Sequence, residues 1–321
     1  MYKFRFSEDT SNSFGPGLTL VLFLGTTLGC IIVYSLIQIA VLGNPQSFES
    51  YCADTIRCLA LQGFSMIMVF ILPVFILLKV ILKKSFEYLN SDTAQLNRQL
   101  LVLFLGVLLM IVAYPLVLET ANLTTSFLTS DGYIQWEKSV FNGGIAGMAQ
   151  NLLDAEESYN AIVQTFLNVE GVFGMVLLFI VVAILPGIAE ELVFRGFLQN
   201  ILMKIIKNPH ISIWLAAFIF SLIHGSLLNL IPRMLMGAVL GYVYYYSQNI
   251  WIPIIVHAVN NAASIIYMKM LEAEIVTTNI EEMEHLPLMV VIASAVFAPI
   301  LLWQFKRFAK ESLIPKDTEQ F

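Results

Sequence analysis

The stretch GVFGMVLLFIVVAILPGIAEELVFRG, residues 171–196, begins with 19 residues that include no Asp, Glu, Lys or Arg. The hydrocarbon core of a bilayer is about 30 Å thick, and a helix needs about 20 apolar residues to cross it. A helix also pairs its own backbone amides and carbonyls, as that core requires. The stretch therefore predicts a membrane-spanning helix that carries Glu190, Glu191 and Arg195 near its end.

The composition of the whole chain agrees with a membrane protein. Of the 321 residues, 58% are hydrophobic and 12% are charged, and the mean hydropathy is +0.79. A globular domain carries about 25% charged residues, so this chain has too little polar surface to coat a soluble body. The net charge of −6 offers no basic surface for nucleic acid. We predict an all-α, polytopic transmembrane helical bundle that has membrane lipids and no nucleic acid among its partners.

Other stretches without charged residues predict the remaining spans. They are residues 10–48, 58–78, 99–118, 208–232, 234–268 and 285–305. The stretch 234–268 is long enough for two spans and has a polar break at Ser247-Gln248-Asn249. The chain is therefore expected to contain about eight spans.

The positions of Lys and Arg indicate the topology, because cytoplasmic loops are enriched in both residues. With a cytoplasmic N-terminus, twelve of the 17 cations fall on the inner side: Lys3, Arg5, Lys79, Lys83, Lys84, Arg98, Lys204, Lys207, Lys306, Arg307, Lys310 and Lys316. Only Arg57, Lys138, Arg233 and Lys269 fall outside, and Arg195 lies within a helix. We therefore expect both termini in the cytoplasm and the protein in a bacterial inner (plasma) membrane.

This pattern divides the chain into four parts. Residues 1–118 hold three spans, 119–170 form an acidic extracytoplasmic loop, 171–270 hold the charged motifs, and 271–321 hold the last span and a cytoplasmic tail. Within the loop, residues 145–169 have apolar residues at helical spacing. They predict either an amphipathic helix at the surface or a solvated connector.

The three cysteines have different expected environments. Cys30 lies in the first span and is expected to be a small packed residue. Cys52 and Cys58 both fall in the first outer loop. They form a disulfide if that loop faces an oxidising compartment, and two unpaired thiols are the alternative.

Three groups of polar residues lie inside predicted spans, where ionisable side chains are costly and therefore candidates for function. Glu191 and Arg195 form an i,i+4 acid-before-base pair, and Glu190 points about 100° away from Glu191. The alternative is that all three lie among lipid headgroups where the helix emerges. Apolar residues on both sides of the pair argue against that alternative.

The other two groups each contain a histidine. His224 follows Phe220 at i,i+4, and His257 and Asn261 share one helical face. Glu190 is about 17 residues before a turn near Lys207, and His224 is about 16 residues after it, so an antiparallel hairpin would bring both to one level. The fifth span is then short, and we expect an irregular connection near Gly225.

These motifs resemble those of the CAAX-protease and bacteriocin-processing family of intramembrane endopeptidases, which includes the type II CAAX prenyl proteases. The resemblance covers about residues 171–270. It implies a helical membrane protease whose site opens toward the cytoplasmic half of the bilayer. It also implies roles for six residues: Glu190 and His224 activate a water, His257 and Asn261 stabilise the oxyanion, and Glu191 and Arg195 orient the first carboxylate.

The chemistry of the residues is compatible with these roles. Peptide hydrolysis needs a base for water, an acid for the leaving amine and donors for the oxyanion. Glu190, His224 and His257 are also a candidate zinc ligand set, and the metal-free version in which glutamate activates the water is the one we prefer. Ser221 and Ser226, near His224, are less favoured nucleophiles. The expected substrate is a peptide or protein at the membrane.

Two other functions use similar residues. Carboxylates and histidines in the membrane interior also occur in proton-coupled transporters. A non-catalytic membrane scaffold or bacteriocin-immunity factor could keep the motifs and act by binding. Peptide cleavage that depends on Glu190 and His224 distinguishes the enzyme from both.

Overall fold

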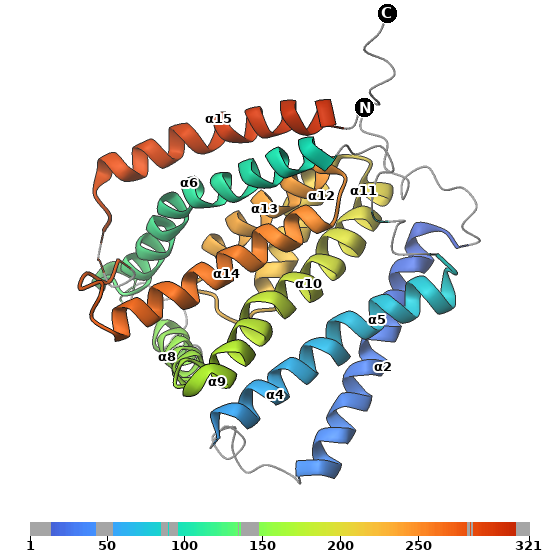
Figure 1. Ribbon diagram of the computed structural model, residues 1–321, viewed down its shortest axis with the longest axis horizontal. Helices are drawn as coiled ribbons and strands as arrows, with labels where there is room; N and C mark the ends of the chain where they lie inside the picture. Colours follow the sequence, from blue (N-terminus) through green and yellow to red (C-terminus); the bar gives the residue numbers. More distant parts are fainter. Residues whose placement is uncertain are drawn as a thin grey trace, which may run out of the picture.

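The computed structural model describes residues 14–42, 54–84, 89, 96–133, 135, 148–280, 283 and 285–312. Within these residues every regular element is a helix (Figure 1). The predicted all-α class is therefore confirmed.

In the described part of the chain, six helices are long and apolar enough to cross a membrane. Two of them contain π-helical segments. The six are α2 (Pro16–Leu42); α4 (Thr55–Met66) with η1 (Ile67–Ile71), α5 (Leu72–Phe75) and η2 (Ile76–Ile81); α6 (Leu96–Leu128); α9 (Gly171–Leu178) with η4 (Phe179–Ile184), α10 (Leu185–Glu191), η5 (Leu192–Gln199) and α11 (Asn200–Ile206); α14 (Trp251–Glu272); and α15 (Leu288–Ser312).

The other two predicted spans correspond to α12 (Pro209–Leu222) and α13 (Leu230–Ser247). Helix α12 is apolar but has only 14 residues. Each of the eight predicted spans thus corresponds to a helix. The cytoplasmic position of both termini stays a prediction.

Helix α6 is longer than the sequence indicated. Helix α6 continues to Leu128, so residues 119–128 are helical and do not belong to a loop. Helix α15 packs along α6, and its Ser294 hydroxyl donates to the Val112 carbonyl at 2.6 Å and accepts from the Leu116 amide at 3.2 Å. The continuous helix from α9 to α11, which we call the rod, extends past the charged motif to Ile206. The residues after that motif are buried and packed against neighbouring helices.

The turns between helices fall at polar or glycine residues. Lys207 adopts a left-handed conformation with φ of 58°, and the Asn208 side chain then caps α12. Gln248, with φ of 50°, separates α13 from α14 at the predicted polar break. After α12 the chain is irregular and Gly225 has φ of 74°, which confirms the irregular connection predicted there.

The rod from α9 to α11 runs through the middle of the bundle. It lies between the helix that begins with α4 and helix α14, and α12 and α13 cover its second half (Figure 1). Phe197, Ile201 and Tyr244 are buried in the largest apolar cluster of the described residues. The charged motif of the rod therefore lies inside the protein and away from the lipid-facing surface.

The helix predicted over residues 145–169 is present as α8 (Met148–Leu167). Its apolar residues Val163, Phe166 and Leu167 pack in one cluster with Leu178 of α9 and Ala262 of α14. Helix α8 thus covers one end of the bundle, where α9 begins and α14 ends (Figure 1).

Cys30 follows the sequence analysis, whereas Cys58 lies in helix α4 and not in the outer loop where it was expected. Cys30 is free and buried in α2. Cys58 is disulfide-bonded, so the alternative of an unpaired thiol at this position is wrong. Cys52, the expected partner, lies outside the described residues.

Candidate active site

A close approach of two helices brings the charged motif of α10 to α14. A Cβ atom at Gly187 would lie 3.0 Å from the Ile254 carbonyl oxygen and 3.1 Å from the Ala258 nitrogen. Only glycine allows backbones to come this close without displacing one of them. The next turn of α10 therefore presents Glu190 and Glu191 to the α14 turn that carries His257.

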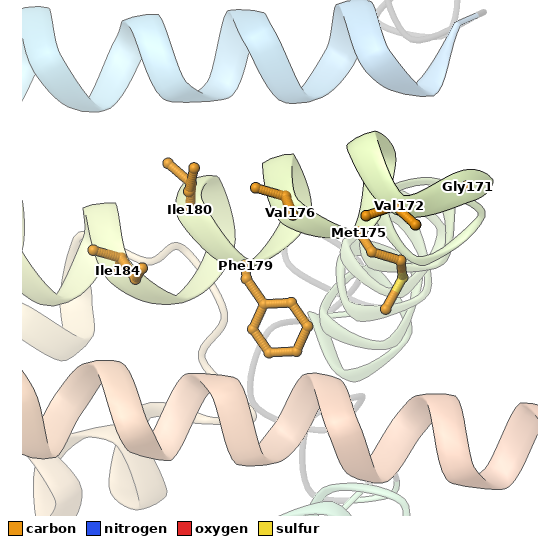
Figure 2. Close-up of a pocket in the computed structure, with 7 residues that line it drawn as sticks. All are labelled: Gly171, Val172, Met175, Val176, Phe179, Ile180 and Ile184. Atoms are coloured by element: carbon orange, nitrogen blue, oxygen red, sulfur yellow. The ribbon is translucent and has the colours of Figure 1, made fainter.

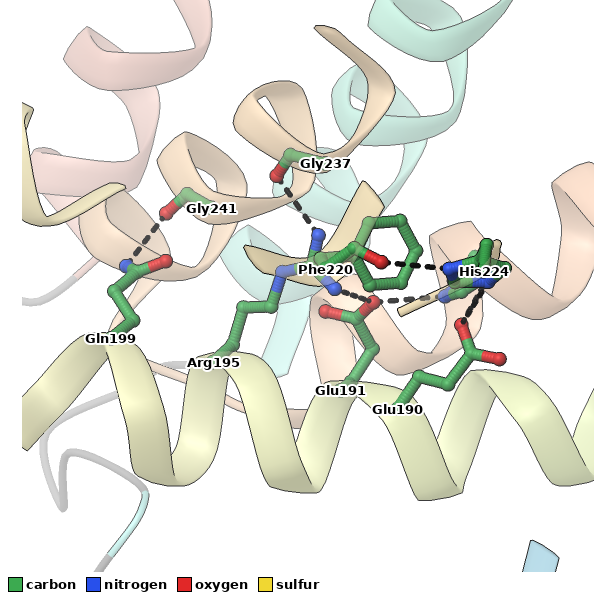
Figure 3. Close-up of polar contacts among 9 residues, drawn as sticks. Glu190, Glu191, Arg195, Gln199, Phe220, His224, Gly237 and Gly241 are labelled. Carbon is green, nitrogen blue, oxygen red and sulfur yellow. Dashed lines mark hydrogen bonds and ion pairs between the residues drawn. The ribbon is translucent and has the colours of Figure 1, made fainter. Parts of the chain in front are cut away.

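Glu191 is fully buried and accepts two strong contacts on one oxygen. Its Oε1 lies 2.6 Å from Nη1 of Arg195 (Figure 3). The same oxygen lies 2.8 Å from Nδ1 of His257. Oε2 of Glu191 has no hydrogen-bond partner among the residues that the structure describes. The carboxylate therefore holds His257 and Arg195, while Glu190, the next residue, faces a different pair of atoms.

Arg195 ties the motif to two further helices. Its Nη2 donates to the Gly237 carbonyl of α13 at 2.9 Å, and its guanidinium lies 4.9 Å from the Phe220 ring centroid of α12. A buried charge is costly unless it is paired and hydrogen-bonded. These contacts meet that need for Arg195, whose side chain is 2% exposed.

Phe220 also fixes the ring of His224. Nδ1 of His224 lies 2.7 Å from the Phe220 carbonyl oxygen, and the two rings meet edge to face at a centroid distance of 4.7 Å. A carbonyl oxygen only accepts, so Nδ1 carries the hydrogen. In the neutral ring Nε2 then has a free lone pair.

His257 has the same tautomer for a similar reason. Its Nδ1 faces the Glu191 carboxylate, which accepts when ionised. Nε2 of His257 lies 3.8 Å from Oε2 of Glu190, and Nε2 of His224 lies 3.9 Å from that same oxygen. Three acceptors thus converge with a gap between them.

A water molecule suits this gap better than a metal ion does. A water oxygen can lie about 2.8 Å from each of two acceptors that are this far apart. Zinc holds nitrogen and oxygen ligands at about 2.0–2.2 Å, which in a tetrahedral site places two ligands about 3.4 Å apart, closer than the separations of 3.8 and 3.9 Å here. Among the described residues, no group of three or more His, Cys, Asp or Glu side chains is placed to hold a metal ion.

Asn261 lies one turn beyond His257 and contacts the long rod. Its Nδ2 is 3.4 Å from the Val182 carbonyl oxygen. Val182 is four residues before Pro186, which has no amide hydrogen to offer that carbonyl. Asn261 therefore contacts the π-helical segment η4, while the other five predicted residues lie in the network around the two carboxylates.

The two serines near His224 donate their hydroxyl hydrogens elsewhere. Ser221 donates to the Leu230 carbonyl at 2.7 Å, and Ser226 donates to Glu156. Since each hydroxyl has one hydrogen, neither is activated by His224 in this arrangement.

The sequence motifs did not identify the glycines of α13 that allow it to pack closely against α12 and η5. A Cβ atom at Gly237 would lie 3.1 Å from Cδ1 of Phe220, and one at Gly241 would lie 2.8 Å from Oε1 of Gln199. Gln199 donates to the Gly241 carbonyl at 3.1 Å (Figure 3). The spacing of Gly237 and Gly241, four residues apart, indicates a helix face that can pack closely. It does not indicate which helix that face contacts.

Comparison with known families agrees with this geometry. Residues 172–263 match the family model described as "Type II CAAX prenyl endopeptidase Rce1-like". We refer to this segment, which is similar to that family, as the Rce1-like domain. The resemblance found in the sequence motifs is thereby confirmed, and all six predicted site residues lie within the Rce1-like domain.

A curated relative also matches part of the chain. The protein named "Putative membrane peptidase YdiL" from Bacillus subtilis (strain 168) is 28% identical over 130 residues, which are 40% of this chain and 51% of the relative. The chain thus spans about half the length of the curated relative that it matches. No solved structure matches the chain.

An apolar groove runs along the beginning of the Rce1-like domain. It has a volume of about 700 Å³ and is lined by Gly171, Val172, Met175, Val176, Phe179, Ile180 and Ile184 (Figure 2). Val172 and Val176 are among the most exposed of these side chains. Such a surface is typical of a helix face in contact with lipid, so the groove belongs to the membrane-facing side of the domain.

Proposed function

We propose that the protein is an intramembrane endopeptidase that hydrolyses peptide bonds of membrane-associated proteins or peptides. The observation that carries this proposal is the convergence of Nε2 of His224 and Nε2 of His257 on Oε2 of Glu190, at 3.9 and 3.8 Å. The Rce1-like domain and the similarity to a membrane peptidase support a protease. The roles proposed for the site residues are those that the family resemblance implies, and the geometry is compatible with them.

The gap between Glu190, His224 and His257 is the proposed position of the attacking water. A water there can donate one hydrogen to Glu190 and one to a histidine, which leaves a lone pair for attack. Side chains that are held in place by other contacts lose little free energy when they orient a reactant. Phe220 holds His224 and Glu191 holds His257, so the site has this property.

The reaction needs no covalent intermediate. The water oxygen attacks the carbonyl carbon of the peptide bond while Glu190 takes one of its protons. The carbon–nitrogen bond then breaks, and the proton returns to the leaving amine. The products are a carboxylic acid and an amine, and atoms and charges balance.

His257 and Asn261 are the proposed oxyanion donors. His257 can donate to the oxyanion when its Nε2 carries a hydrogen, and the contact of its Nδ1 with Glu191 at 2.8 Å fixes the orientation of the ring. The Asn261 amide would have to turn from Val182 toward the substrate. Because the Val182 contact is long at 3.4 Å, little is lost in that rotation.

We also infer the side of the membrane that each end of the bundle faces. Lys79, Lys83, Lys204 and Lys207 lie where η2 and α11 end, which by the alternation of the helices is the end where α2 begins. The positive-inside rule assigns this end to the cytoplasm. The disulfide at Cys58, at the opposite end, supports an oxidising exterior there. A bacterial inner (plasma) membrane fits both features.

The test compares peptide termini in native membranes. Cells expressing the wild-type chain and the Glu190→Gln variant are lysed, and new N- and C-termini of membrane proteins are identified by chemical labelling and mass spectrometry. Termini that depend on the wild-type chain, and that also disappear with His224→Ala, support the peptidase. Identical termini in all three membranes, with equal amounts of folded protein, reject it.

Measurement of a proton gradient across liposomes that contain the protein is a second test. If the wild-type protein cleaves no membrane peptide and instead dissipates a proton gradient, the transporter interpretation replaces the peptidase. Absence of both activities leaves a binding function as the remaining interpretation.

A further inference from the structure

Helix α8 contacts the segment that carries His224. The carboxylate of Glu156 accepts a hydrogen bond from the Ser226 hydroxyl and another, 2.8 Å long, from Nδ2 of Asn229. Ser226 and Asn229 lie in the irregular connection between α12 and α13, which begins directly after α12. A side chain of the acidic outer segment is thus bonded to the connection that follows a proposed catalytic histidine.

The connection has few backbone contacts of its own. The His224 and Gly225 amides donate to the Ser221 and Leu222 carbonyls at 3.3 and 3.1 Å, and the Leu230 amide donates to the Leu227 carbonyl at 3.2 Å. Farther along, the Ser226 hydroxyl oxygen accepts from the amide and the side chain of Asn229, both at 3.3 Å. The fold of residues 225–229 therefore depends on the side chains that Glu156 binds.

Helix α8 is itself anchored by contacts that do not involve Glu156. Val163 and Phe166 pack against a cluster that includes Leu59 and Leu178. Glu156 lies seven residues before Val163, and residues seven apart lie on the same face of a helix. The packing of α8 therefore presents Glu156 to the connection, whereas its neighbour Glu157 is exposed.

We propose that Glu156 is a positioning residue for the reaction. It holds the connection after α12 and thereby keeps the His224 ring level with Glu190. This inference rests on the proposed peptidase function. The His224 side chain is 24% exposed, so its ring has room to move when the following backbone is released.

The first test separates turnover from binding. The substrate is a synthetic peptide that spans a cleavage site mapped by the comparison of termini, and the enzyme is the full chain in liposomes. Glu156→Ala should lower kcat by about 10- to 100-fold, because a displacement of about 1 Å of a reacting group has an effect of this size. KM should stay near the wild-type value, since Glu156 does not face the gap at Glu190.

Two variants on the same helix provide the comparison. Glu157→Ala removes an equal charge from an exposed neighbouring position and should keep the wild-type kcat. Glu156→Gln can still accept from Asn229 and can donate to the Ser226 oxygen, so it should recover most of the rate. Equal kcat values for Glu156→Ala and Glu157→Ala overturn the proposal.

Asn229→Ala tests the contact from the other side. If Glu156 acts through Asn229, the double variant that combines Glu156→Ala with Asn229→Ala should lose little more activity than either single variant. Independent, multiplicative losses contradict the proposed route.

Hydrogen exchange distinguishes failure of this inference from failure of the proposed function. Amides of residues 223–229 should exchange faster in Glu156→Ala than in wild type or Glu157→Ala, because the connection opens more often. This readout needs no substrate. Unchanged exchange overturns the positioning role even in an active enzyme, whereas a wild-type chain that cleaves nothing but shows the exchange difference rejects only the peptidase.

Discussion

Gly187 of α10 packs directly against the backbone of α14, and a Cβ atom at this position would lie 3.1 Å from the nitrogen of Ala258. Two of the three nearest atoms, the Ala258 nitrogen and the Ile254 carbonyl oxygen, belong to the backbone. A larger residue can therefore be accommodated only by moving one helix. Because Glu190 is one turn from Gly187 and His257 is next to Ala258, that movement would widen the gap between the proposed catalytic groups.

We expect Gly187→Ala to reduce activity more than stability. Overpacking of a close contact costs about 1–3 kcal/mol, while a shift of reacting groups by about 1 Å costs on the order of 100-fold in rate. Rates of peptide cleavage and thermal unfolding in one detergent measure the two effects. Gly29→Ala in α2 is the control, because a Cβ atom there meets nothing within 4 Å. A wild-type rate for Gly187→Ala would show that the close crossing is not needed.

The two adjacent carboxylates should affect different properties. Glu191→Ala leaves Arg195, only 2% exposed, without its carboxylate, and breaking a buried pair in this way costs about 3–5 kcal/mol. Glu190→Gln should abolish cleavage but leave the unfolding temperature near that of wild type, since its ion-pair contacts are no shorter than 3.8 Å. Thermal unfolding of both purified variants measures this contrast. Equal destabilisation by the two substitutions would contradict it.

Much of this arrangement could be predicted from the sequence. The run 171–189 and the scarcity of charge predicted a helical membrane protein. Every helical span needs about 20 apolar residues, and its backbone amides and carbonyls must be paired within the protein. The spacing of Glu190 and His224 around the turn at Lys207 also predicted that both would lie at one level. These inferences needed only helical geometry.

Contacts between distant helices could not be predicted in the same way. The family resemblance implied that Glu191 and Arg195 orient Glu190, and it gave no indication that Glu191 also contacts His257, 66 residues away. Nothing local in Glu156 pointed to Ser226 and Asn229. Such pairings depend on which helices cross, and here the crossings depend on glycines whose partners only the three-dimensional structure identifies.

Arg195 should not tolerate replacement by lysine. Its Nη1 contacts Glu191 and its Nη2 contacts the Gly237 carbonyl, and a lysine ammonium lacks the planar fork that makes both bonds. Loss of one hydrogen bond to a charged group costs about 1.5–3 kcal/mol. Arg307→Lys is the matched control, because Arg307 forms an exposed i,i+4 pair with Glu311, a kind of pair worth about 0.3–0.5 kcal/mol. Chemical unfolding of both variants measures the difference, and similar losses would contradict the bridging role of Arg195.

The distances around Oε2 of Glu190 also make a prediction about zinc. At 3.8 and 3.9 Å from this oxygen, the two histidine nitrogens leave the gap in which we propose that the attacking water is hydrogen-bonded. For zinc to bind, all three side chains would have to move inward, against the contacts of His224 with Phe220 and of His257 with Glu191. We therefore expect cleavage by the purified protein to survive a strong chelator and not to rise when zinc is added. Elemental analysis of the same sample should find far less than one zinc per chain. If the rate is lost on chelation and zinc restores it with one bound ion, then these three residues are ligands, and the water that attacks the peptide is activated by the metal and not by Glu190.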